Sequence, residues 1–293
     1  MEQSIRPVSL KSFPPGAPFE KKQLCAYGPI SETSIPPLRS ESMSQETHHP
    51  DVMIDLVKVT KVYPPDVQAI SDISLTVAKG EIVFLTGMSG AGKTTLLRLI
   101  SRIEKPTKGM VEVAGFDIAK LPQRNIHQLR RKIGMAYQDF KLLPERTVAD
   151  NIAIAMEVVY RPPSFIEKRI RALLDQLDLV RKYATPTGEL SRGEQQRVSI
   201  ARAVANFPEI VLADEPTGNL DAETTGKVMN LFHQLNCQGT TILIATHDQS
   251  LYQRTSHRII ELRFGRLRSQ VSDPPEENSE EEAASSLFPS SEA

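Results

Sequence analysis

The sequence predicts an α/β fold, and three residue patterns support this prediction. An apolar run over residues 81–86 is followed by a glycine-rich loop and then by helix-forming residues from Lys93 onward, in the order strand, loop, helix. Alternating apolar residues before that loop indicate antiparallel strands. The apolar segments 209–216 and 240–246 are typical of parallel strands that are buried on both faces. We therefore expect a mixed or parallel core sheet with flanking helices, beside a smaller antiparallel sheet.

The composition limits the classes of protein to consider. The 293 residues are 40% hydrophobic, enough for a sizeable core in one or two domains. A formal net charge of -1 favours neither nucleic acid nor an anionic membrane as a partner. Cys25 and Cys237 form neither a C-x-x-C motif nor a metal-ligand set, which indicates a reduced, cytosolic chain. No apolar run approaches the roughly 18 residues that span a bilayer, so we expect membrane contact only through a partner.

Shifts in composition divide the chain into three segments. Residues 1–51 are rich in Pro and Ser, residues 52–270 carry the periodic apolar pattern, and residues 271–293 are acidic with no basic residue. Both end segments bury too little apolar surface to offset their conformational entropy, so we expect them to be disordered. The aromatic residues near the N-terminus fit either a short docking motif or a tail with no specific role.

The loop at residues 87–94 has the pattern G-x-x-x-x-G-K-T of a phosphate-binding loop. Its glycines let the backbone turn so that successive N–H groups face an anion at the N-terminus of the next helix. Lys93 then reaches the β- and γ-phosphates of a nucleotide, and the Thr94 hydroxyl binds Mg²⁺. An ordinary glycine turn is the alternative, but the bare pattern arises by chance in only about one chain in a hundred of this length.

The strands before and after this loop place two further candidates. Tyr63 ends the first strand because two prolines follow it, and it either stacks on an adenine ring or packs at the sheet edge. Strands are also expected at residues 109–115 and 133–137, the second leading to Gln138. The loop 139–146 that follows contains apolar residues, which need a surface to cover them.

Three helices are expected in the second half of the chain. The first follows a capping pair, Thr147 and Asp150, and the second covers residues 165–180. The third starts at Ser191, which forms a capping box with Glu194, and runs to about residue 205. A capped helix N-terminus is also an anion site. A second phosphate site in a chain that already has one suggests that it serves a nucleotide bound by a second copy.

Two adjacent carboxylates, Asp214 and Glu215, stand at the C-terminal end of the strand in 209–216, where ligands bind in parallel sheets. Since adjacent residues on a strand point to opposite sides, we assign Asp214 to the metal ion and Glu215 to the base that activates water. A solvated strand end is the alternative. The neighbouring strand ends at His247, which is placed to hydrogen-bond a γ-phosphate. A last hairpin is expected at 257–268.

Together these motifs resemble the ATP-binding cassette (ABC) ATPases over residues 52 to about 268. The matches, in sequence order, are the A-loop aromatic Tyr63, the Walker A motif 87–94, the Q-loop Gln138, the signature motif 190–196, the Walker B motif 210–215, the D-loop 218–221 and the switch histidine His247. The resemblance implies a P-loop NTPase with an antiparallel β subdomain and a helical signature subdomain. Arg192 stands where the family usually has glycine, but Ser191 and Gly193 are kept, so we expect activity to survive.

The resemblance also implies a role for each matching residue. ATP is expected to contact Tyr63, Gly87, Ser89, Gly90, Ala91, Gly92, Lys93, Thr94, Thr95, Gln138, Ser191, Gly193 and Asp221. Mg²⁺ is expected at Thr94, Gln138 and Asp214. Glu215 polarises the attacking water, while Lys93 and His247 stabilise the charge on the transferring phosphoryl group. Two copies are implied to close head to tail on two ATPs, each lying between the Walker A motif of one subunit and Ser191 and Gly193 of the other.

Within this family, residues 137–144 and 147–151 look most like the bacterial cell-division ATP-binding proteins FtsE. That resemblance implies an FtsX-like integral membrane partner, a peripheral position on the cytoplasmic face of the inner membrane, and no nucleic-acid partner. We expect a helix of the partner to dock on the loop 139–146, against Phe140 and Leu142. Residues 213–221 are shared with ATPases of lipoprotein release and macrolide export, which keeps that role open. A soluble ABC ATPase acting on DNA or ribosomes would usually carry a second cassette or a long coiled coil.

Overall fold

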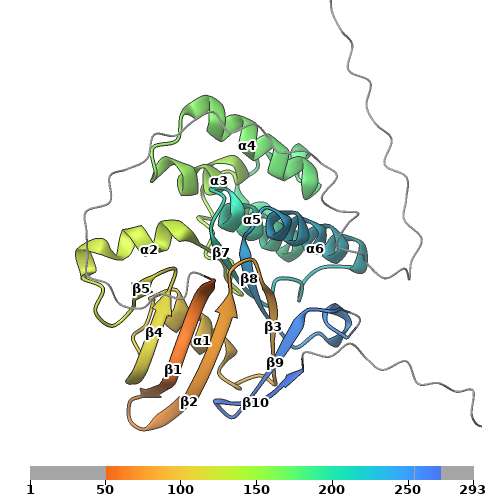
Figure 1. Ribbon diagram of the computed structural model, residues 1–293. Coiled ribbons are helices and arrows are strands. Elements are labelled where there is room, and N and C mark those ends of the chain that lie inside the picture. Colours follow the sequence, from red (N-terminus) through yellow and green to blue (C-terminus); the bar gives the residue numbers. More distant parts are fainter. Residues whose placement is uncertain (1–50, 254, 272–293) are drawn as a thin grey trace, which may run out of the picture.

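The computed structural model describes residues 51–253 and 255–271 (Figure 1). The end segments for which the sequence predicts disorder lie almost wholly outside these residues. Among the helices of the described ranges, none has both the length and the apolar composition needed to cross a membrane.

The smaller sheet is antiparallel, as the alternating apolar pattern predicts. Its strands lie in the order β2-β1-β4-β5. They are β1 (Val52–Tyr63), β2 (Val67–Ala78), β4 (Lys108–Val113) and β5 (Phe116–Asp117). In β1, Ile54 and Leu56 are buried while Val57 on the other face is exposed, which is the two-residue period of a half-buried strand. β1 ends at Tyr63, as expected.

The larger sheet has strands in the order β10-β9-β3-β8-β7-β6. They are β10 (Arg266–Val271), β9 (Arg258–Arg263), β3 (Ile82–Thr86), β8 (Thr241–Thr246), β7 (Ile210–Asp214) and β6 (Ile133–Ala136). β10 pairs antiparallel with β9, which confirms the last hairpin, and the other neighbouring strands are parallel. Every residue of β3, β7 and β8 is buried, which explains why their sequences are apolar without alternation.

Helices cover both faces of this core sheet. The described residues form α1 (Lys93–Ile100), α2 (Ile126–Lys132), α3 (Val148–Glu157), α4 (Pro163–Gln176), α5 (Arg192–Val204) and α6 (Ala222–Cys237). On one face, Val83 and Leu85 pack with α1 and the inner side of the smaller sheet. On the other face, Phe84 and Val211 pack with α3, α4, α5 and α6. Figure 1 shows these four helices on the side of the molecule away from β1 and β2.

The helix ends show where local sequence rules hold. Both predicted capping boxes are formed, by Thr147 with Asp150 at α3 and by Ser191 with Glu194 at α5. The range predicted for the middle helix, 165–180, is wrong at both ends. α4 begins at Pro163, where the fixed φ of proline suits the first helical turn, and it ends at Gln176 because Asp178 adopts a left-handed backbone with φ of 52°. α2 and α6 were not predicted from the sequence.

Candidate active site

The glycine loop joins β3 to α1 at the C-terminal edge of the core sheet. Gly87 and Gly92 have φ of 144° and 107°, which side-chain-bearing residues rarely adopt. A Cβ atom on Gly87 would lie 2.2 Å from the carbonyl oxygen of Leu262, and one on Gly92 would lie 2.7 Å from that of Ala69. Glycine is therefore required at both positions by the neighbouring backbone as well as by the turn.

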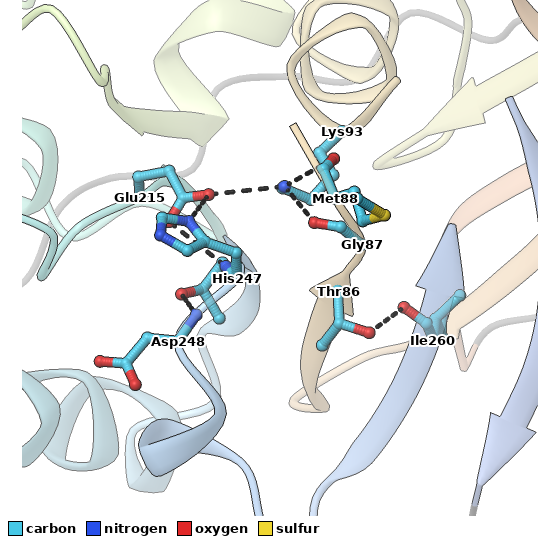
Figure 2. Close-up of polar contacts among 9 residues, drawn as sticks. Thr86, Gly87, Met88, Lys93, Glu215, His247, Asp248 and Ile260 are labelled. Atoms are coloured by element: carbon cyan, nitrogen blue, oxygen red, sulfur yellow. Dashed lines mark hydrogen bonds and ion pairs between the residues drawn. The ribbon is translucent and has the colours of Figure 1, made fainter. Parts of the chain in front are cut away.

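Lys93 is the first residue of α1, and its ammonium group turns back over the loop (Figure 2). The Nζ atom donates to the carbonyl oxygens of Gly87 at 2.6 Å and Met88 at 3.4 Å. It also lies 3.5 Å from Oε1 of Glu215, and both side chains are largely buried, at 8% and 11% exposure. The predicted lysine and the predicted base therefore face each other.

Asp214 ends β7 and is 2% exposed. Burial raises the pKa of its carboxyl group, and the charge of Glu215 adds to this effect, whereas a hydrogen bond from Thr94 opposes it. Its Oδ1 atom has no hydrogen-bond partner in the part of the chain that the structure describes. A buried, unpaired carboxylate oxygen beside the Thr94 hydroxyl offers the hard oxygen ligands that Mg²⁺ prefers, so these residues fit the predicted metal site.

Glu215 lies beyond the end of β7. The expectation that Asp214 and Glu215 point to opposite sides because both belong to one strand is therefore wrong. β7 ends at Asp214, and Glu215 has a left-handed backbone with φ of 50°, fixed by a hydrogen bond from its N–H to the Ala245 carbonyl at 2.8 Å. This turn, and not strand alternation, directs the Glu215 carboxylate toward His247. Nδ1 of His247 lies 2.8 Å from Oε1 of Glu215 (Figure 2).

Tyr63 is half-buried and has charged neighbours that were not predicted from the sequence. The Lys61 ammonium lies over its ring, 4.9 Å from the centroid, and also pairs with Glu104 at 3.2 Å. Burial raises the pKa of the Tyr63 phenol, and the neighbouring Glu104 carboxylate raises it further. The Lys61 ammonium therefore covers one face of the ring, and stacking of adenine on the other face stays a prediction.

The loop after β6 differs from the expected docking surface. Gln138 is exposed, but Phe140 is only 8% exposed and Leu142 packs against the helical side of the core. Phe140 is covered because its loop folds back onto α5, where its carbonyl oxygen accepts a hydrogen bond from Arg202 at 2.6 Å. Because Phe140 is buried, the expectation that Phe140 and Leu142 form an open docking surface is wrong for Phe140. No spacing in the sequence indicates the contact between Phe140 and Arg202.

Ser191 in the signature motif caps α5 and also keeps a donor for an anion, so its two predicted roles are compatible. Its Oγ atom accepts from the N–H of Glu194 at 3.3 Å, and its own N–H donates to the Glu194 carboxylate at 2.8 Å. Because a hydroxyl accepts and donates at once, the cap leaves the Ser191 proton available for an anion. Ser191 and Arg192 are exposed. A Cβ atom on Gly193 would lie 3.0 Å from the Asn219 carbonyl oxygen, so the D-loop lies against this motif.

Asp221 caps α6 by accepting from the N–H of Thr224 at 2.8 Å, a hydrogen bond that lowers the pKa of Asp221. The structure thus groups Lys93, Asp214, Glu215 and His247 in one cluster. Within 51–253 and 255–271, no hydrogen bond or ion pair joins Ser191 or Asp221 to that cluster. Residues that connect the motifs, such as Arg202, carry no motif signal of their own.

A glycine loop and two carboxylates at the C-terminal edge of a parallel sheet define a nucleotide-binding P-loop protein. The chain belongs to the ABC transporter family, which matches residues 70–218, and within it to the group of FtsE cell division ATP-binding proteins. It is 46% identical to the cell division ATP-binding protein FtsE of Bacillus subtilis over 213 residues, 73% of this chain and 93% of that protein. It is 45% identical to FtsE of Escherichia coli K12 over 219 residues, 75% of this chain and 99% of that protein.

A solved structure agrees with this assignment. A dimeric ATP-binding cassette in a post-hydrolysis state, bound to ADP and phosphate, is 36% identical, with a TM-score of 0.71 over 75% of this chain and 98% of that chain. The ABC-type fold expected from the sequence is thereby confirmed. The roles of the individual site residues stay predictions.

Proposed function

We propose that the chain is the Mg²⁺-dependent ATPase subunit of an FtsEX-like complex in bacterial cell division. In this proposal, ATP-driven closure of a homodimer moves an integral membrane partner. The observation that carries the enzymatic part is the cluster in which Glu215 lies 2.8 Å from His247 and 3.5 Å from Lys93. The similarity to FtsE proteins over 93–99% of their length supports the biological role.

ATP binding would use the loop and its surroundings. The N–H groups of 87–94 surround the phosphates, Lys93 binds the β- and γ-phosphates, and Tyr63 stacks on the base. Thr94, Gln138 and Asp214 would hold Mg²⁺, which neutralises phosphate charge when bound. The buried, unpaired Oδ1 of Asp214 supports this assignment.

Hydrolysis would proceed by in-line attack of water on the γ-phosphorus. Glu215 accepts a proton from the water as the new phosphorus–oxygen bond forms and the bond to the ADP oxygen breaks. His247 holds the Glu215 carboxylate in place, and His247 and Lys93 donate to the oxygens on which negative charge develops. Ser191 and Gly193 of a second copy would contact the γ-phosphate of the same ATP, which the dimeric form of the similar cassette supports.

The partner surface would lie in the helical part of the chain. Because Phe140 is buried, we place this surface in the groove between α3 and α4, which has a volume of about 580 Å³. Apolar side chains such as Ala153, Ile166 and Ile170 line it, and Tyr160 at its rim is 89% exposed. A helix of an FtsX-like protein would dock there, which would hold the chain at the cytoplasmic face of the inner membrane.

The test is to purify the Glu215→Gln variant from its native membranes with ATP. We expect loss of hydrolysis, a stable ATP-bound dimer and co-purification of an FtsX-like protein. The Lys93→Ala variant is the control, and it should stay monomeric with ATP. Hydrolysis by Glu215→Gln at the wild-type rate would refute the assignment of the base. Co-purification of a lipoprotein-release or macrolide-export permease would show a transport role in place of the cell-division role. Recovery of the variant without any membrane protein would argue against both roles.

A further inference from the structure

The turn that follows Gln138 has an unusual backbone. Phe140 and Lys141 are consecutive residues with φ of 59° and 49°, in the left-handed region that non-glycine residues rarely adopt. Such a conformation persists only where the surrounding structure holds it. The groups that hold this turn therefore control how the loop is positioned.

Two side chains of α5 hold the turn. The guanidinium group of Arg202 donates to the carbonyl oxygen of Phe140 at 2.6 Å and to that of Lys141 at 2.7 Å. The Ser199 hydroxyl donates to the same Phe140 carbonyl at 3.3 Å. Arg202 is half-buried, and burial lowers its pKa. The planar fork of arginine binds the carbonyls of both left-handed residues at once, which a single ammonium group does not reproduce.

The far end of the same loop is tied to the segment that leads into the signature motif. Asn151 is fully buried, and its side-chain amide binds Leu143 twice, accepting from the N–H at 2.8 Å and donating to the carbonyl at 3.1 Å. The Thr187 hydroxyl donates to the Leu143 carbonyl at 2.8 Å. Thr187 stands four residues before Ser191. The loop is therefore attached at one end to α5 and at the other to α3 and to the segment that precedes Ser191.

These contacts make the Gln138 loop and the signature helix one mechanical unit. α5 is a single helix that is capped by Ser191 and carries Arg202 near its other end. In the dimer of the proposed function, Gln138 would contact the ATP of its own subunit, while Ser191 would contact the ATP of the other. We propose that Arg202 is a positioning residue that couples the two ATP sites, because it holds the turn after Gln138 against the helix that presents Ser191.

The test compares two half-buried arginines in the full-length protein. Arg202→Lys keeps the charge but loses the two-pronged contact with the turn. Arg169→Lys is the matched control, because Arg169 on α4 donates to the carbonyls of Val204 and Ala205 at 3.0 and 3.2 Å, and burial lowers its pKa to about 10. It contacts the end of the same helix without touching the loop. The measurement is the Hill coefficient of ATP hydrolysis, with kcat and KM, alongside the Tm of each variant.

We expect a wild-type Hill coefficient approaching the limit of about 2 for two coupled sites. Arg202→Lys should lower it toward 1, while Arg169→Lys should lower the Tm and leave the Hill coefficient unchanged. The proposal that Arg202 couples the two ATP sites would be overturned by any of three results. These are an unchanged Hill coefficient in Arg202→Lys, an equal fall in Arg169→Lys, and hydrolysis by the wild type without cooperativity. Failure of the wild type to bind and hydrolyse ATP would refute the proposed function itself. Should Arg202→Lys not fold, Ser199→Ala must lower the coefficient in the same direction, and an unchanged value would equally overturn the proposal.

Discussion

Replacing Asp214 with Asn should raise the Tm of the protein measured without nucleotide, although it should abolish Mg²⁺-dependent ATP hydrolysis. Asp214 is 2% exposed and its Oδ1 atom has no partner among the residues that the structure describes. A buried charged group with an unmade hydrogen bond costs about 2 kcal/mol, and a neutral amide of the same shape removes much of that cost. For a domain of this size, about 2 kcal/mol corresponds to an increase in Tm of roughly 4–8 °C.

The pH dependence of this gain follows from the raised pKa of Asp214. The folded protein binds this proton more tightly than the unfolded chain, so the folded state becomes less stable as the pH rises from the ordinary carboxyl value to the folded pKa. The difference in Tm between Asp214→Asn and wild type is therefore largest at neutral pH. It should shrink as the pH is lowered toward about 4, the ordinary pKa of an aspartate.

Thermal unfolding followed by circular dichroism at several pH values measures this effect, with Asp66→Asn as an exposed control that should change the Tm little. Adding Mg²⁺ and ATP should stabilise the wild type more than Asp214→Asn, because ligand binding adds to the stability of the folded state only where the site is intact. A lower Tm for Asp214→Asn without nucleotide, or a gain that does not depend on pH, would refute the reasoning.

Three further predictions concern the glycine loop, the buried amide of Asn151 and the expected adenine contact at Tyr63. Gly92→Ala should lower the Tm more than Gly90→Ala. A Cβ at Gly92 would lie 2.7 Å from the Ala69 carbonyl oxygen, whereas one at Gly90 would meet nothing within 4 Å. Equal decreases in Tm would contradict this prediction. Asn151→Ala should cost about 3 kcal/mol in chemical denaturation, since buried groups lose their partners, and a loss below about 1 kcal/mol would show that the loop rearranges. Tyr63→Leu should raise the KM for ATP roughly tenfold through lost stacking while Tyr63→Phe keeps it. Equal KM values would favour edge packing.

The parts of the site that depend on short-range rules could be predicted from the sequence. The spacing of Gly87 and Gly92 is informative because the backbone admits no Cβ at either position. The capping boxes depend only on residues three apart, and Ser191 forms the one at α5. The smaller sheet was predicted from apolar alternation, and the core sheet from apolar segments without alternation.

Features that depend on distant contacts were missed or misjudged. Phe140 stands in a loop, and nothing nearby in the sequence indicates that Arg202, 62 residues away, folds that loop against α5. α2 has only seven residues, and just Ile126 and Leu129 of them are buried, which is too little for a periodic pattern. α6 was available to sequence analysis, because Val228, Leu231, Phe232 and Leu235 have helical spacing on its buried face.

The contacts of Lys93 have a consequence for the release of products. An ammonium group has three protons, and in this structure two point to the carbonyl oxygens of Gly87 and Met88 while the carboxylate of Glu215 lies 3.5 Å away. A phosphate oxygen bound by Lys93, as proposed, would therefore compete with Glu215 for the remaining donor. In the proposed mechanism Glu215 holds the proton of the attacking water after hydrolysis, and once it has passed that proton on, its carboxylate would compete with inorganic phosphate for the lysine. The residue proposed to start the reaction would in this way also help to clear the site for the next ATP.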